Sequence, residues 1–244
     1  MNDILEFSKQ REACLAAMKE NVELSNLSTK FIKETGFLKY TYNFDWLGLP
    51  IIQFPQDIIA VQEIIWKTKP DIIIETGIAR GGSLILSASI LHLLNGNGKV
   101  IGIDIDIRPH NRQAIELHPL AHRIVLIQGS STDNSVLEQL KQHVKSRDRV
   151  MVILDSNHVH EHILQELQLY SPIVTKDCYL VVMDTVIEDM PEDYFPNRPW
   201  GKGNNPKTAV HAFLKTTDRF QIDESIQNKL LITVAPDGYL KCVK

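Results

Sequence analysis

A glycine-rich loop follows a continuous β-branched run and is the first candidate for ligand chemistry. The run Ile72-Ile73-Ile74 leads into Glu75-Thr76-Gly77, and Arg80-Gly81-Gly82-Ser83 follows. Glycines let the backbone turn sharply and approach a ligand, and the N-terminus of a following helix favours negative groups. The G-x-x-x-G-G spacing differs from the G-x-G-x-x-G of dinucleotide-binding proteins. The pattern therefore indicates a nucleotide-like cofactor other than a dinucleotide, with packing of the turn alone as the alternative.

Polar residues also follow the next two apolar runs. Asp104 ends the run 100–103, and its carboxylate can accept both hydroxyls of a ribose. Gln128-Gly129-Ser130 follows the run 124–127, where polar groups can read an adenine edge. In an open α/β sheet the carboxyl ends of the strands border the ligand crevice. Three successive strand ends with this chemistry favour a nucleoside cofactor, and together with the loop spacing they favour S-adenosylmethionine.

Two aspartates end the fourth and fifth apolar runs. Asp155 follows 150–154, and Asp184 follows 179–183. Both carboxylates are expected in the same crevice, and such a pair suits Mg²⁺, which takes oxygen ligands and keeps several waters. The ion would bind substrate oxygens and lower the pKa of an attacking hydroxyl. The alternative is that Asp155 only caps the helix that follows it.

Three histidines follow Asp155 closely. His158 and His162 are four residues apart and would share a helix face. With Asp155 they match a 2-His-1-carboxylate iron site, which makes an Fe(II)-dependent hydroxylase an alternative. That interpretation leaves the glycine loop and Asp104 unexplained. His158, at the crevice mouth, suits a general base because its ordinary pKa lies near 6.5, whereas His160 and His162 are interpreted as solvated or packing residues.

The elements that position these residues alternate regularly along the chain. Strands are predicted at 72–75, 100–104, 124–128, 150–155 and 179–184, with helices at 82–94, 112–117, 134–144 and 159–170. Such alternation predicts a mostly parallel α/β sheet with helices on both faces. After a helix that ends near 217, strands at 220–222 and 230–234 bring the total to seven, and Asp237-Gly238 predicts a tight turn.

The remaining segments are assigned to an extension and a lid. Residues 1–50 are predicted as a helical extension, packed on a main domain that spans 51–244. Asp57 is expected to cap a short helix that runs to Lys67. The Pro-, Gly- and Asn-rich segment 185–206 is expected to form a lid-like insertion.

Composition excludes several other classes of protein. The net charge is -4 over 244 residues, and no basic run tracks a phosphate backbone, so a nucleic acid partner is not expected. The three cysteines include no CxxC pair, which argues against a zinc or disulfide framework. No secretory signal is visible, and no apolar run reaches the ~18 residues of a membrane span. We expect a cytoplasmic protein without a membrane span.

Taken together, these motifs resemble the bacterial cephalosporin hydroxylase family, also called rhamnosyl O-methyltransferase-like. The resemblance runs from about Pro50 to Leu240. Its carriers are the segments 74–77 with 80–83, 102–111, 128–131, 154–158, 184–189, 198–201 and 203–206.

The resemblance implies a Rossmann-like class I S-adenosylmethionine-dependent methyltransferase, often a homo-oligomer, which methylates oxygen with help from Mg²⁺. By analogy Asp155 and Asp184 hold the metal, and His158 stands where related enzymes carry a basic residue. The family pattern has Glu before the second aspartate, whereas this chain has Met183. A thioether is a poor Mg²⁺ ligand, so the expected metal site is either reduced, completed by water or Asn157, or lost.

The complete prediction is an O-methyltransferase for a hydroxyl of a small polyol, sugar or natural-product acceptor. The alternatives are the Fe(II) hydroxylase and a non-catalytic cofactor-binding module. The cofactor-binding residues are predicted to be Glu75, Gly77, Arg80, Gly81, Ser83, Asp104, Asp106, Gln128, Gly129, Ser130 and Asp155. The catalytic residues are predicted to be His158 and Asp155. The acceptor-contacting residues are predicted to be Arg108, His110, Asn111, Trp200 and Asn205.

Overall fold

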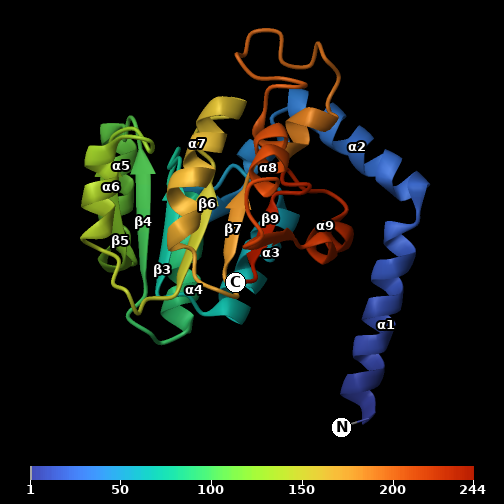
Figure 1. The fold of residues 1–244 in the computed structure, drawn as a ribbon, viewed down its shortest axis with the longest axis horizontal. Helices are drawn as coiled ribbons and strands as arrows, with labels where there is room; N and C mark the ends of the chain where they lie inside the picture. The colour runs from blue at the N-terminus through green and yellow to red at the C-terminus, as the bar shows by residue number, and fades with distance from the viewer. Residues whose placement is uncertain (1) are drawn as a thin grey trace.

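The computed structural model describes residues 2–244, and its centre is one seven-stranded sheet (Figure 1). Its strands in chain order are β3 (Ile72–Thr76), β4 (Lys99–Asp104), β5 (Ile124–Gln128), β6 (Val150–Leu154), β7 (Tyr179–Val182), β8 (Phe220–Ile222) and β9 (Tyr239–Cys242). Their order in space is β5-β4-β3-β6-β7-β9-β8, with β3 to β7 parallel and β9 antiparallel to both neighbours. The predicted mostly parallel seven-stranded sheet is confirmed.

Helices cover both faces of the sheet (Figure 1). One core cluster includes side chains from α3 (Pro55–Thr68), α4 (Gly82–Leu93), α5 (Pro109–Glu116) and α9 (Glu224–Leu230). The other includes side chains from α6 (Asn134–Lys141), α7 (His160–Tyr170) and α8 (Pro206–Leu214). Successive residues of β3 belong to opposite clusters, as with Ile73 and Ile74. This two-sided burial explains why the strand sequence is continuously apolar.

The chain reverses its direction of travel across the sheet at β3. It passes from β3 to β4 and β5 on one side, and then returns to β6 and β7 on the other side. A doubly wound sheet binds ligands beyond the carboxyl ends of the strands at such a point. The ends of β3, β4 and β6, at Thr76, Asp104 and Leu154, therefore border the crevice.

The N-terminal segment forms two helices, α1 (Asn2–Lys19) and α2 (Val22–Phe37). α1 projects from the body of the molecule (Figure 1), and the Lys19 ammonium lies 2.7 Å from the Glu224 carboxylate on α9. α2 lies near the segment 185–206, where the Tyr194 hydroxyl donates a hydrogen bond to the Lys33 carbonyl. Within residues 2–244 no helix is long and apolar enough to cross a membrane.

Short elements connect the main ones. They are η1 (Tyr40–Asn43), β1 (Asp45–Trp46), β2 (Leu49–Pro50), η2 (Ala121–Arg123), η3 (Ser171–Ile173) and η4 (Thr185–Asp189).

The strand predicted at 230–234 is wrong. α9 ends at Leu230, residues 231–234 belong to no helix or strand, and the last strand is β9, which follows the turn at Asp237. The Asp223 side chain caps α9, and Ile226 and Leu230 are buried four residues apart, which is helical spacing. The apolar run 230–234 begins at the last residue of this helix and continues into the loop after it, and its composition is that of a short buried strand, so the sequence did not separate the two.

The predicted capping role of Asp57 is also wrong. The N-cap of α3 is Phe54, and the carboxylate of Asp57 is fully buried. It accepts hydrogen bonds from the Thr233 hydroxyl, the Val234 amide at 2.9 Å and the Tyr239 hydroxyl at 2.7 Å. Asp57 therefore ties α3 to the C-terminal part of the chain. Burial raises its pKa to about 6, although the three donors act in the opposite direction.

The raised pKa of Asp57 gives a testable pH dependence. In Asp57→Asn the charge is lost, so the variant lacks this titration. As pH rises from about 4 to about 6, the unfolded carboxyl ionises at its ordinary 3.8 while the folded one keeps its proton. The free energy of unfolding of the wild type should therefore fall relative to that of the variant, by up to about 3 kcal/mol. Urea unfolding of both proteins at several pH values measures this difference.

Asp45→Asn, which alters an exposed aspartate in β1, serves as the matched control. A stability difference between wild type and Asp57→Asn that stays constant from pH 4 to pH 7 would contradict the raised pKa.

Candidate active site

The glycine loop connects β3 to α4 with three residues in the left-handed region. Gly77, Ala79 and Gly81 have φ values of 87°, 45° and 88°. A Cβ atom on Gly77 would lie 2.1 Å from the carbonyl oxygen of Asp155, so no other residue fits there without displacing the end of β6. The loop thus lies directly against the strand that carries the first predicted metal ligand.

Glu75 anchors the C-terminal end of the glycine loop. It is buried in β3 and accepts a hydrogen bond from the Ser83 hydroxyl in the first turn of α4. Burial raises the pKa of Glu75 to about 7, and the Ser83 bond opposes that rise. Its second carboxylate oxygen has no hydrogen-bond partner among the described residues. Glu75 therefore positions the loop, while Ser83 itself lines the cavity above it.

The Asp104 carboxylate fixes the loop from the neighbouring strand. One oxygen accepts a hydrogen bond from the Ile78 amide at 2.8 Å, and the other accepts one from the Asp106 amide at 3.0 Å. Asn111 adds a third support, because its amide donates to the Ala79 carbonyl at 2.7 Å. The structure therefore gives Asn111, which the sequence assigned to the acceptor, a contact with the loop.

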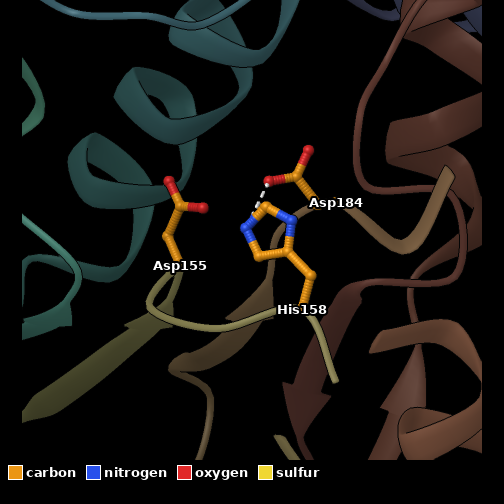
Figure 2. Close-up of side chains that lie close together, drawn as sticks. All are labelled: Asp155, His158 and Asp184. Atoms are coloured by element: carbon orange, nitrogen blue, oxygen red, sulfur yellow. Dashed lines mark ion pairs between the residues drawn. The ribbon is translucent and has the colours of Figure 1, made fainter. Parts of the chain in front are cut away.

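Asp155, His158 and Asp184 meet beyond the ends of β6 and β7 (Figure 2). One donor atom from each residue lies within 4.8 Å of the other two. The His158 Nε2 atom is 3.3 Å from a carboxylate oxygen of Asp184. Asp184 has a left-handed backbone with φ of 56°, a conformation that non-glycine residues seldom adopt and that often marks functional sites. Met183 lines the same cavity and is 2% exposed.

Negative charge is concentrated at this cluster. Burial raises the pKa of Asp155 well above its ordinary value, and the nearby carboxylates of Asp184 and Glu75 raise it further. Two carboxylates this close repel each other, and a cation between them would offset that repulsion. The residues present fit a divalent cation. The donors are one imidazole nitrogen and two carboxylates, rather than the three carboxylates that the resemblance implies.

The three histidines after Asp155 have different surroundings. The His158 ring packs on Trp200, with ring centroids 4.8 Å apart. The His160 Nδ1 atom is 2.7 Å from the Thr208 hydroxyl. The His162 Nε2 atom contacts the hydroxyls of Ser131 and Ser156 at 3.2 and 3.3 Å. The iron triad of Asp155, His158 and His162 is therefore not assembled.

A cavity of about 590 Å³ joins the loop to the cluster, a volume typical of small-molecule sites. The predicted site residues that line it are Gly77, Arg80, Ser83, Asp104, Asp155, His158, Asp184 and Trp200. The remaining predicted residues lie outside its lining; they are Glu75, Gly81, Asp106, Arg108, His110, Asn111, Gln128, Gly129, Ser130 and Asn205.

Among the residues outside the cavity lining, Asn205 supports the predicted lid segment. Asn205 is fully buried and caps α8 through its side chain, with its amide donating to Glu188 and to the Gly201 carbonyl at 2.8 Å. It thus shapes the segment 185–206. Arg108 is exposed, 3.9 Å from the carboxylate of Asp106.

With this geometry in view, comparison with known proteins identifies the family. The family model Rhamnosyl O-methyltransferase/CmcI matches residues 38–243. The chain belongs to this family. A rhamnosyl O-methyltransferase of Mycobacterium tuberculosis is 30% identical over 201 residues, covering 80% of this chain and 76% of the relative. That of Mycobacterium leprae is 28% identical over 200 residues, covering 80% and 81%.

Solved structures confirm the class I methyltransferase fold. A CmcI structure with Mg and SAM has a TM-score of 0.57 at 20% identity and covers 83% of this chain and 78% of its own. An O-methyltransferase from Bacillus cereus in complex with SAH has a TM-score of 0.55 at 14% identity, covering 87% and 90%. The predicted class, an S-adenosylmethionine-dependent O-methyltransferase, is confirmed.

One wall of the cavity lies before the region that the rhamnosyl O-methyltransferase/CmcI model matches. Gly36 and Phe37 of α2 line the cavity beside Tyr194. The Tyr194 hydroxyl donates to the Lys33 carbonyl at 2.7 Å, and its ring packs on Phe37 at 4.6 Å. A Cβ on Gly36 would lie 2.1 Å from the Tyr194 hydroxyl oxygen. We define Lys33, Gly36, Phe37 and Tyr194 as the α2 clasp.

Sequence reasoning did not predict the α2 clasp. The aromatic run from Tyr40 to Trp46 indicated an ordered loop, but nothing local pairs Tyr194 with a helix 161 positions earlier. The clasp connects the predicted lid segment to the N-terminal extension, so these two parts form one side of the cavity together.

The clasp predicts a measurable change in local opening. Tyr194→Phe deletes one hydrogen bond, worth about 1 kcal/mol, so amides within 185–206 should exchange hydrogen roughly fivefold faster. Gly36→Ala should have a larger effect, because the new methyl group displaces the Tyr194 ring. Hydrogen–deuterium exchange followed by mass spectrometry measures both variants.

Tyr42→Phe, which removes the hydroxyl of a ring that is 60% exposed, is the control for the clasp. If both clasp variants exchange at the wild-type rate, the clasp does not hold the segment.

Proposed function

We propose that this chain transfers the methyl group of S-adenosylmethionine to a hydroxyl of a small polyol, sugar or natural-product acceptor. The observation that carries the proposal is the single cavity that joins the glycine loop and Asp104 to the pair Asp155 and Asp184. A methyl donor and an acceptor hydroxyl must lie in line at contact distance, and holding them so supplies much of the rate. The names of the mycobacterial relatives make a rhamnosyl group the first acceptor to test.

The glycine loop and the ends of β4 and β5 would hold the cofactor, with Gly77 and Asp104 lining the cavity. Gly77 and Gly81 would hold the methionine part of the cofactor. Asp104 would accept the ribose hydroxyls, since an ionised carboxylate has capacity beyond its two bonds to backbone amides. Gln128 and Ser130, at the end of β5, would border the adenine.

Asp155 and Asp184 would hold a divalent cation at the acceptor end. Such a cation supplies Lewis-acid chemistry, lowering the pKa of a bound hydroxyl. The two aspartates orient the acceptor, and Trp200 packs His158 against them. Two roles are chemically open to His158, those of proton acceptor and of metal ligand. The Mg²⁺ in the CmcI structure belongs to a protein that is 20% identical, so the identity of the ion here is part of the proposal.

The alternatives receive different support. The hydroxylase hypothesis loses a ligand, because His162 faces Ser131 and Ser156. One feature, Met183, supports the hypothesis of a non-catalytic binding module, because it removes a carboxylate from the metal site. The cytoplasmic location, the homo-oligomer and the absence of a nucleic acid partner stay predictions.

Calorimetry with S-adenosylhomocysteine tests the cofactor assignment. Asp104→Ala should weaken binding roughly 10- to 100-fold, because it removes a charged hydrogen-bond acceptor that also orders the loop. Glu138→Gln, which alters an exposed carboxylate on α6, should bind as the wild type does. Absence of binding to the wild type at millimolar ligand would end the cofactor assignment.

Chelation tests the part played by a metal. Methyl transfer from labelled S-adenosylmethionine to methyl α-L-rhamnopyranoside should be lost in EDTA and recovered when a divalent cation is added in excess, because the two aspartates would otherwise repel each other and leave the hydroxyl unactivated. If wild-type turnover is the same in EDTA, no metal takes part in the reaction.

A further inference from the structure

The metal-binding cluster has a donor set that differs from three carboxylates. The resemblance implies a carboxylate at position 183, where this chain carries a buried methionine. The described residues that offer ligand atoms close together are Asp155, His158 and Asp184. A cation at this point would therefore meet two oxygens and one imidazole nitrogen.

The His158 ring is held in the orientation that a ligand needs. Its Nε2 atom faces the carboxylates of Asp155 and Asp184, as Figure 2 shows. Trp200 packs against the ring with centroids 4.8 Å apart, and the Arg198 guanidinium lies 5.0 Å from the Trp200 ring. Since this packing fixes the imidazole before any ion arrives, ligation requires little reorganisation of the site.

Donor chemistry then determines which ions fit. Mg²⁺ requires oxygen ligands in near-octahedral geometry, whereas imidazole suits borderline first-row transition metals. We propose that His158 Nε2 is the third ligand of the cation held by Asp155 and Asp184, and that the site therefore prefers Co²⁺ to Mg²⁺. The proposal rests on the proposed function only in that it puts a cation at the acceptor end of the cavity.

Ligation changes the assignment of His158. A ring nitrogen bound to a cation cannot accept a proton from the acceptor hydroxyl. His158 would then act by fixing and tuning the ion. The ion would lower the pKa of the acceptor hydroxyl, and the hydroxyl proton would pass to solvent water as the oxygen takes the methyl group and the sulfonium is neutralised.

Metal binding to the intact chain, measured without an acceptor, tests the proposal. Calorimetry should give tighter binding of Co²⁺ than of Mg²⁺ to the wild type, by about tenfold or more. His158→Gln should lose at least about tenfold in Co²⁺ affinity while its Mg²⁺ affinity changes little, since even partners outside the ligand shell contribute that much. His162→Gln is the matched control and should keep the wild-type affinities, because His162 lies outside the cluster.

Spectroscopy separates ligation from indirect effects. Pulsed electron paramagnetic resonance of bound Mn²⁺ should detect nitrogen coupling in the wild type and in His162→Gln, and none in His158→Gln. Met183→Glu should raise the affinity for Mg²⁺ by about tenfold and reduce the preference for Co²⁺, because it supplies a third carboxylate. Thermal unfolding of each variant verifies that it is folded.

The outcomes separate this proposal from the proposed function. Nitrogen coupling that persists in His158→Gln, or equal Co²⁺ affinities in that variant and the wild type, would overturn the ligation of His158. Failure of the wild type to bind any divalent cation while it binds S-adenosylhomocysteine would also overturn it, and the cofactor assignment would stand. Metal binding with nitrogen coupling in a chain that does not bind S-adenosylhomocysteine would leave the ligation intact and remove the methyl donor.

Discussion

The contact between Gly77 and the backbone of Asp155 sets the geometry of the whole site. No Cβ fits between them, and the Asp155 amide donates to the Thr76 carbonyl at 2.9 Å. The loop assigned to the methyl donor and the strand end assigned to the cation are thus joined through the backbones of β3 and β6. The distance between the loop and the end of β6 is therefore set by the backbone and does not change when side chains rotate. A displacement in either strand would change the spacing of donor and acceptor, on which in-line transfer depends.

Charge imposes the second constraint. Asp184 raises the pKa values of both Asp57 and Asp155, and Glu75 adds to the effect at Asp155. These carboxylates come from four separate elements, yet they share one field at the carboxyl end of the sheet. A site with this field favours cations, and both the sulfonium of the methyl donor and a divalent ion carry positive charge. Burying these carboxylates costs folding stability. The negative field that they create favours binding of positively charged ligands.

Sequence reasoning succeeded where one physical rule links a residue's position in the sequence to its location in the fold. Parallel strands have their carboxyl ends at one edge, so Asp104, Asp155 and Asp184 could be brought together from alternation alone. It failed where hydrogen-bond partners are far apart in the sequence. Asp57 finds its donors more than 170 positions later, and Tyr194 finds Lys33 across a similar distance. Local pattern carries no information about such pairs, so Asp57 was assigned to the nearest helix end and the α2 clasp was missed.

The stacking of Trp200 connects the segment 185–206 to the cluster of Asp155, His158 and Asp184. Trp200 and Arg198 both belong to the segment 185–206 and both line the cavity, while the Trp200 ring fixes the imidazole of His158. The same segment is attached to α2 through Tyr194. An acceptor that moves this segment would therefore also move the support of the nitrogen donor. Because Met183 offers no carboxylate, the proposed cation would depend on that nitrogen more than one held by three carboxylates, and its binding would then be coupled to the fit of the acceptor.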